Sequence, residues 1–158
     1  MVRQLETAEE KRQIAAAILH RLPQWFGLPD STAEYIRDCG ALPFWAWYCR
    51  GTPAGFIALK ETSPFAGELY CMGVLPECHR QGAGRALFEA LARQARDRGY
   101  EFLQVKTLKM GCCPEYDATN RFYQALGFRP LECLPTLWGE QNPCQIYIMS
   151  LKEGGGNG

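Results

Sequence analysis

Residues 68–109 constrain the fold more than any other part of this sequence. Two apolar runs of strand length, residues 68–75 and 101–109, enclose a segment whose apolar residues, among them Leu87 and Leu91, recur at helical spacing. Arginines occupy the other faces of that segment, and a glycine follows its end. The pattern predicts a strand, a helix and a second strand, and therefore a sheet with a helix on one face.

The N-terminal part predicts two helices. Residues 6–20 begin with a threonine and acidic residues, which are typical of a helix start, and then place apolar side chains on one helical face. A second, shorter helix is expected to start at Asp30 or Ser31, with Glu34 three residues after Ser31 as in a capping box, and to end at Gly40. A loop should connect the two helices.

The remaining segments predict strands and one more helix. Aromatic and apolar runs flank a Gly-Thr-Pro turn, so a β-hairpin is expected there. The expected strands are residues 44–50, 54–62, 128–134 and 144–151, and the expected helix is residues 118–126. No repeat or linker divides the chain, so we predict one domain over residues 1–152, a mixed sheet with helices on its faces, and a flexible Gly-rich tail at 153–158.

Composition excludes several function classes. Lys and Arg number 17, as do Asp and Glu, so no net field favours nucleic acid or an anionic membrane. The charged N-terminus has no apolar core of a signal peptide, and no apolar run is long enough to cross a bilayer. These features favour a cytoplasmic protein, and a homodimer is compatible with them.

The chain contains eight cysteines, and their expected redox state depends on the cell compartment. Without a signal peptide, they favour reduced thiols over a disulfide framework. The closest pair, Cys112 and Cys113, is adjacent and lacks the spacing of zinc ligands, so no metal is expected. This pair lies in an expected loop, where oxidation is most plausible.

The clearest chemical signal lies where the strand ends and the helix begins, in the segment VLPECHRQGAGRAL at residues 74–87. Glycines at 82 and 84 let a ligand approach the backbone, while the free N–H groups and the positive end of the helix attract an anion. Arg80 and Arg85 strengthen that interpretation over a turn that uses glycine for geometry alone. The sequence departs from the Walker and Rossmann patterns, because Arg85 and Ala86 follow Gly84 and Leu87 replaces the third Rossmann glycine.

Residues 79–84, HRQGAG, resemble the acetyl-CoA signature of the GNAT superfamily, with His79 at a position where Gln or Arg is more usual. Residues 120–128, NRFYQALGF, resemble the family segment in which an Asn and a Tyr on a short helix face the cofactor. The resemblance covers roughly residues 3–150. It implies an α/β (α+β) GNAT fold, with a mostly antiparallel sheet of six to seven strands, about four helices, and strands that splay at the CoA site.

The resemblance also implies a cosubstrate, acetyl-CoA, whose pantetheine arm pairs with the strand backbone at Met72–Val74. An N–H near Met72 or Gly73 would polarise the thioester carbonyl. The residues expected to bind the cosubstrate are Met72, Gly73, Val74, His79, Arg80, Gln81, Gly82, Ala83, Gly84, Arg85, Asn120 and Tyr123. Asn120 could equally be a helix cap.

Acetyl transfer to an amine needs a base for the ammonium and an acid for the departing thiolate. By the resemblance, Tyr123 is the expected acid, with a packed helix tyrosine as the alternative. Glu68 is the expected base, with a surface carboxylate as the alternative. Tyr70 shares its strand face and is a second polar candidate. Water alone could also serve as the base.

The acceptor is expected to be a primary amine, attacked directly in a ternary complex. Trp25, Phe26, Tyr116 and Trp138 lie in or beside expected loops and could line its cleft, or could simply cover the sheet. Two other functions stay open: a sensor that binds acyl-CoA without turnover, and a domain that binds another nucleotide. An enzyme would consume acetyl-CoA, whereas a sensor would leave it intact.

Overall fold

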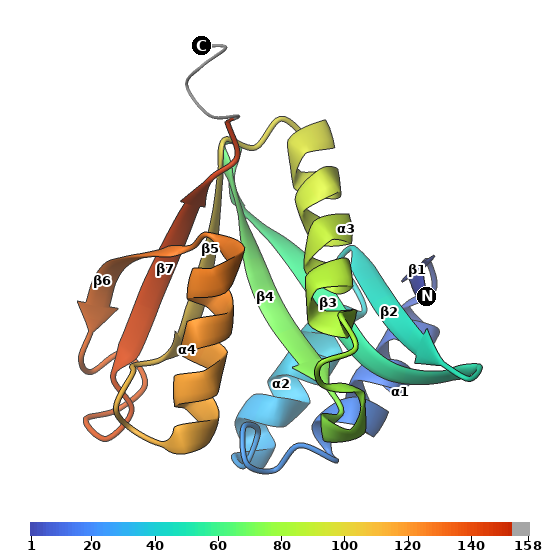
Figure 1. The fold of residues 1–158 in the computed structure, drawn as a ribbon, viewed down its shortest axis with the longest axis horizontal. Coiled ribbons are helices and arrows are strands. Elements are labelled where there is room, and N and C mark those ends of the chain that lie inside the picture. Colours follow the sequence, from blue (N-terminus) through green and yellow to red (C-terminus); the bar gives the residue numbers. More distant parts are fainter. Residues whose placement is uncertain (153–158) are drawn as a thin grey trace. The chain divides into compact units, whose positions relative to one another are not determined.

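The computed structural model describes residues 1–152, so the predicted tail at 153–158 lies outside the described residues. Its strands follow the order β1-β2-β3-β4-β5-β7-β6 in a seven-stranded sheet (Figure 1). The chain forms two compact units, one of Met1–Lys60 with Leu69–Ala95, the other of Glu61–Glu68 with the chain from Arg96 onward. The seven mostly antiparallel strands and four α-helices confirm the predicted fold class.

The elements lie close to their predicted positions. The helices are α1 (Ala8–Leu19), α2 (Pro29–Cys39), α3 (Ala83–Asp97) and α4 (Pro114–Leu126), with a short 3-10 helix at Pro76–Cys78. The strands are β1 (Val2–Leu5), β2 (Phe44–Cys49), β3 (Thr52–Ser63), β4 (Ala66–Val74), β5 (Phe102–Leu108), β6 (Arg129–Leu134) and β7 (Cys144–Ser150).

In the first unit, α1 and α2 lie on one face of the strands and α3 on the other (Figure 1). A Cβ built on Gly73 of β4 would meet Ile18 and Leu22, from α1 and the turn after it, at 3.2 and 3.0 Å. On the other side, a Cβ on Gly55 of β3 would meet Leu87 of α3 at 3.4 Å. Glycine at these two positions therefore lets each helix pack closely on the sheet.

In the second unit, β7 lies between β5 and β6 and pairs antiparallel with both. Helix α4 lies against β5 and β7, which its Asn120 reaches through hydrogen bonds. The start of β4 pairs in parallel with β5 over three residue pairs, from Ala66–Phe102 to Glu68–Gln104. The predicted splay further along these strands stays a prediction.

Two local expectations were wrong, and one strand was missed. Strand β1 was not expected, because four residues with a charged neighbourhood carry little strand signal; it forms by pairing with β2 at Val2↔Trp47 to Leu5↔Phe44. The capping box was also wrong: α2 starts at Pro29 behind Leu28, without a side-chain cap hydrogen bond. Helix α4 begins at Pro114, four residues before the expected start. Both helices use proline in the first turn, where its missing N–H costs nothing.

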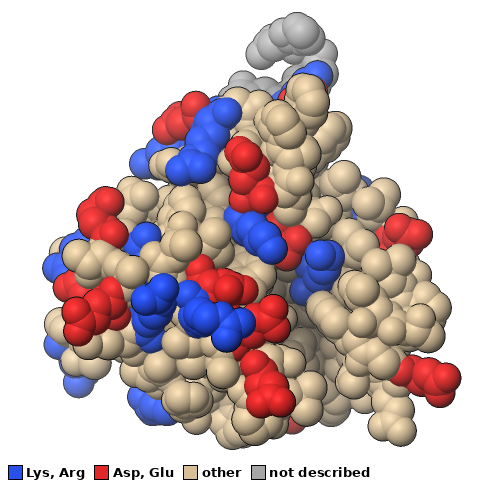
Figure 2. Space-filling view, turned by 180° about the vertical axis from the view of Figure 1, so that it is seen from behind, with Lys and Arg blue, Asp and Glu red and all other residues tan. Residues whose placement is uncertain are grey.

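Charged side chains of both signs are interspersed on the face shown in Figure 2. On this face the distribution agrees with the equal numbers of basic and acidic residues, 17 of each, in the sequence. Within residues 1–152 no helix has the length and hydrophobicity needed to cross a membrane. The same residues contain no group of three His, Cys, Asp or Glu side chains arranged to hold a metal ion.

Candidate active site

The loop between β4 and α3 has two left-handed residues in quick succession. Arg80 has φ 67° and Gly82 has φ 80°. A non-glycine residue with positive φ is uncommon and costs free energy, so such strain persists where surrounding contacts or function require it. Helix α3 starts immediately afterwards at Ala83, with the first helical bond running from the Ala86 N–H to the Gly82 carbonyl.

The loop around Gly82 is open. A Cβ built on Gly82 would meet no heavy atom within 4 Å, so the positive φ, and not close packing, accounts for the glycine. The N–H groups of residues 83–85 precede the first helical donor, the Ala86 N–H, so they have no helical acceptor, and the helix dipole places positive charge at this end. Arg80 and Arg85 are exposed beside the loop. The loop therefore fits a pyrophosphate such as that of CoA.

His79, the departure from the usual signature, supports the loop from the side. Its Nε2 lies 2.9 Å from the Val74 carbonyl oxygen, and its ring lies edge-on to Trp25 at a centroid distance of 6.4 Å. Gln81 donates from Nε2 to the Glu77 carbonyl at 3.3 Å. Both side chains are thus turned to the preceding backbone, which leaves any ligand contact to the loop N–H groups and the arginines.

Tyr70 and Cys71 of β4 both contact α2: the Tyr70 hydroxyl donates to Asp38, and the Cys71 thiol lies beside the thiol of Cys39. The predicted donor N–H groups, at Met72 and Gly73, follow directly along the same strand.

Tyr70 is held as a hydrogen-bond donor. Its hydroxyl donates to Asp38 Oδ2 at 2.6 Å. Burial raises the pKa of the Tyr70 phenol well above its usual value, and the hydrogen bond to Asp38 and its negative charge raise it further. Because the phenolate is disfavoured, Tyr70 is a poor general base at neutral pH.

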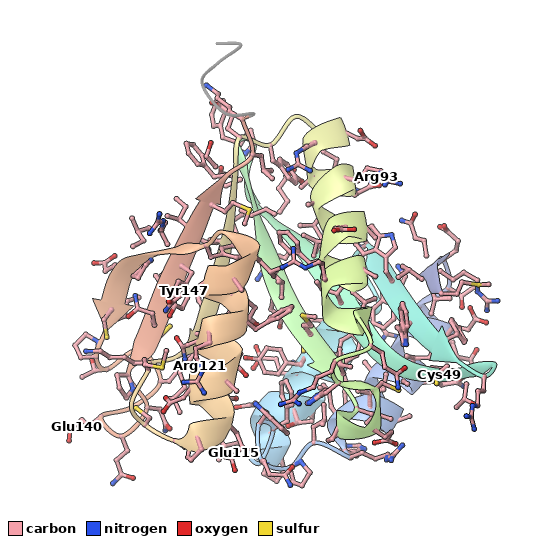
Figure 3. The ribbon with its side chains drawn as sticks, viewed as in Figure 1. Cys49, Arg93, Glu115, Arg121, Glu140 and Tyr147 are labelled. Atoms are coloured by element: carbon pink, nitrogen blue, oxygen red, sulfur yellow. The ribbon has the colours of Figure 1, made fainter. Side chains whose placement is uncertain are left out.

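Glu68 and Tyr123 both lie in the second unit. Glu68 is 7% exposed, and its Oε1 accepts from Gln104 Nε2 at 2.9 Å and lies 3.5 Å from Lys106 Nζ. Tyr123 is also 7% exposed, and its ring packs near Phe128 and Tyr147 at centroid distances of 5.9 and 6.2 Å. Tyr147 lies on β7 and is labelled in Figure 3. Both predicted catalytic residues are therefore firmly positioned by packing.

Asn120 has a structural role that the sequence did not reveal. It is fully buried in the middle of α4, so the helix-cap alternative was wrong. Its Nδ2 donates to the carbonyls of Leu108 and Tyr116 at 2.8 and 2.7 Å, and its Oδ1 accepts from the Tyr147 hydroxyl at 2.6 Å. These bonds tie α4 to β5 and β7. The predicted contact with the cosubstrate would compete with them.

Replacing Asn120 with alanine should therefore destabilise the protein. The change leaves a buried hydroxyl and carbonyl without their partner, which costs about 2–3 kcal/mol of unfolding free energy. Denaturant unfolding followed by circular dichroism measures this. A loss below about 0.5 kcal/mol, the usual effect of a neutral surface change, would contradict the structural role.

The aromatic residues proposed to line an acceptor cleft separate into different settings. Trp25 and Phe26 are half-buried against the core of the first unit. Tyr116 is half-buried on α4 and not in a loop. Trp138 is 38% exposed in the connection between β6 and β7. Phe26 lies edge-on to Tyr35, a residue of α2 that the sequence did not single out.

Known proteins resemble this chain in both sequence and fold. Residues 11–128 match the Acetyltransferase (GNAT) family. The chain is 28% identical over 107 residues, 68% of each chain, to the uncharacterized N-acetyltransferase YsnE of Bacillus subtilis. Its fold is similar to that of a protein from Desulfovibrio desulfuricans, provisionally named a GNAT acetyltransferase, with TM-score 0.79 and 20% identity over 96% of this chain and 100% of that one.

A second similar structure is aminoglycoside 6'-N-acetyltransferase complexed with coenzyme A, with TM-score 0.75 and 15% identity over 98% of each chain. At such low identities the two structures show the fold, while the family match covers most of this sequence. The match includes β4, the loop with two left-handed residues and helix α3. This chain is thus an acetyltransferase of the GNAT family.

Proposed function

We propose that the protein transfers an acetyl group from acetyl-CoA to the primary amine of a small molecule or a protein, by direct attack in a ternary complex. The observation that carries this proposal is the loop before α3, where Arg80 and Gly82 have positive φ and the exposed Arg80 and Arg85 lie beside the unsatisfied N–H groups of the first helical turn. Such a loop binds the pyrophosphate that CoA carries. The family match supports acetyl as the group that is transferred.

Each proposed contact uses a group of suitable chemistry. The N–H groups after Gly82 and the guanidinium groups of Arg80 and Arg85 would hold the pyrophosphate. The backbone of Met72–Val74 would pair with the pantetheine arm, and an N–H near Met72 would polarise the thioester carbonyl. His79 and Gln81 act by supporting the loop, as their backbone contacts indicate.

Two proton transfers accompany the reaction. The acceptor is mostly protonated at neutral pH, since an alkylammonium has a pKa of about 10. It must lose a proton before the neutral amine can attack. Tyr123 would donate its phenolic proton to the departing thiolate, a base of comparable strength. Glu68 would accept the amine proton, directly or through water. Its contacts with Gln104 and Lys106 would then orient the carboxylate.

The Glu68→Gln variant tests whether Glu68 acts as the general base. If Glu68 accepts the proton, turnover of amines at neutral pH should fall about 100-fold, because general-base assistance is worth at least that much. The rate should recover partly as pH rises and the amine deprotonates in solution. The profile of kcat against pH measures this. An unchanged rate at neutral pH would leave the role to water.

The function itself is tested by calorimetry with acetyl-CoA, with desulfo-CoA and NADH as comparisons, followed by thiol release against an amine panel in the same preparation. Selective binding with thiol release is expected. Binding without release from any amine would instead favour a sensor, and absence of binding would contradict the proposal.

The eight free cysteines support a reducing compartment, so we propose a cytoplasmic location. Cell fractionation would check it.

A further inference from the structure

Three aromatic rings form a row in the first unit. Phe26, from the loop after α1, lies edge-on to Tyr35 of α2 with ring centroids 6.0 Å apart. Tyr35 in turn lies 5.4 Å from the ring of Tyr70 on β4 at an interplanar angle of 65°. All three rings are half-buried against the core. The row therefore joins the loop, α2 and β4 in one apolar strip.

A carboxylate lies at the β4 end of this strip. Asp38 Oδ2 accepts the Tyr70 hydroxyl at 2.6 Å, and the Asp38 side chain is 40% exposed. A carboxylate has about four acceptor positions, so most of its capacity is still available. Arg37 Nε lies 3.9 Å from Oδ1, but that guanidinium is 68% exposed and such pairs contribute little. Glu34 on the same helix adds negative charge that the Tyr70 phenol senses.

The Lys60 side chain shows that a cation fits beside the Tyr70 ring. Lys60 Nζ, from β3, lies 5.2 Å from the centroid of the Tyr70 ring. A cation within about 6 Å of an aromatic ring is attracted by its negative face. Lys60 is exposed, so water competes for its ammonium group. A ligand ammonium could bind beside the same ring and the Asp38 carboxylate.

The strip also lies close to the segment of β4 that we propose to hold the pantetheine arm. Tyr70 precedes Met72 by two residues, a distance of about 7 Å along a strand. Met72 begins the backbone segment that we propose to hold the pantetheine arm. An amine held near Tyr70 and Asp38 would thus lie within one side-chain length of that segment.

We propose that Asp38, oriented by Tyr70, binds the acceptor's ammonium, and that the ring row binds its apolar body. The acceptor would be a primary alkylamine with an aromatic or apolar body and no carboxylate beside the amine. Asp38 and Glu34 would repel such a carboxylate, which gives selectivity by like charge. Asp38 is a specificity residue, and Tyr70 is a positioning residue. The inference rests on the proposed function.

The test compares 2-phenylethylamine with phenylalanine, which adds a carboxylate next to the same amine. The wild type should release thiol faster with 2-phenylethylamine. Asp38→Asn keeps an oxygen for the Tyr70 hydroxyl but removes the charge. Because a hydrogen bond to a charged group is worth about 1.5–3 kcal/mol, kcat/KM for 2-phenylethylamine should fall roughly 10- to 100-fold, mainly through KM. Its preference over phenylalanine should shrink as well.

Asp30→Asn, at the other end of α2, is the matched control and should keep the wild-type preference. Tyr70→Phe keeps the ring, frees Asp38 from its hydrogen bond, and should raise KM for 2-phenylethylamine without changing acetyl-CoA affinity. Thiol release with other amines but not with 2-phenylethylamine would overturn the inference and leave the proposed function standing. So would an unchanged preference in a folded Asp38→Asn protein. Loss of acetyl-CoA binding in the wild type would instead count against the proposed function.

Discussion

Replacing Gly82 with valine should weaken acetyl-CoA binding at least 100-fold, the largest effect on affinity that we expect from one substitution. Gly82 has φ 80°, a conformation that costs an L-residue about 1–2 kcal/mol and a β-branched one more. The new side chain would also fill the open space in which we place the pyrophosphate. Isothermal titration with acetyl-CoA measures the change in Kd.

Gly99→Val provides the control, because Gly99 has φ 82° and its Cβ position is equally free of neighbours. This glycine follows the end of α3, whereas Gly82 precedes its start. Both variants should lose comparable stability from backbone strain. Only the Gly82 variant should lose affinity. Equal affinities in the two folded variants would show that the loop is not the phosphate site.

Replacing Tyr123 with phenylalanine should lower kcat about 100- to 10,000-fold, the usual contribution of general acid catalysis. Acetyl-CoA affinity should hardly change, since the proposed contribution of the hydroxyl is to the departing thiolate. The buried ring packs near Phe128 and Tyr147, and phenylalanine keeps that ring. Thiol release at saturating amine and acetyl-CoA measures the effect.

Tyr48→Phe is the companion variant, because Tyr48 lies on β2, its hydroxyl accepts from Arg3, and it has no proposed role in binding or proton transfer. Its kcat should stay close to that of the wild type. If Tyr123→Phe behaves in the same way, Tyr123 is a packed helix tyrosine and the thiolate takes its proton from water.

The segment around α3 was predictable because its signals are local. Apolar residues at helical spacing defined the helix, and Gly82 marked the loop that the structure shows in a left-handed conformation. Backbone geometry of this kind depends on a few adjacent residues. The same locality explains why the sequence suffices to assign the family.

Boundaries and edges were less predictable. Strand β1 exists through its pairing with β2, more than 38 residues away along the chain, and not through its own strand propensity. The start of α4 was misplaced because a proline in the first turn was read as a loop signal. Each of these features depends on neighbours that the local sequence does not identify.

By itself, the sequence determined the α/β fold class and the GNAT family, and it located the loop that we propose to bind the pyrophosphate. Only the tertiary structure decided the structural role of Asn120 and the partner of Asp38. Asn120 finds its hydroxyl partner 27 residues away, and Asp38 meets Tyr70 across 32 residues. A side-chain amide or carboxylate can cap, coordinate, bind substrate or support the core. Which of these it does depends on the partners that folding brings within hydrogen-bonding distance.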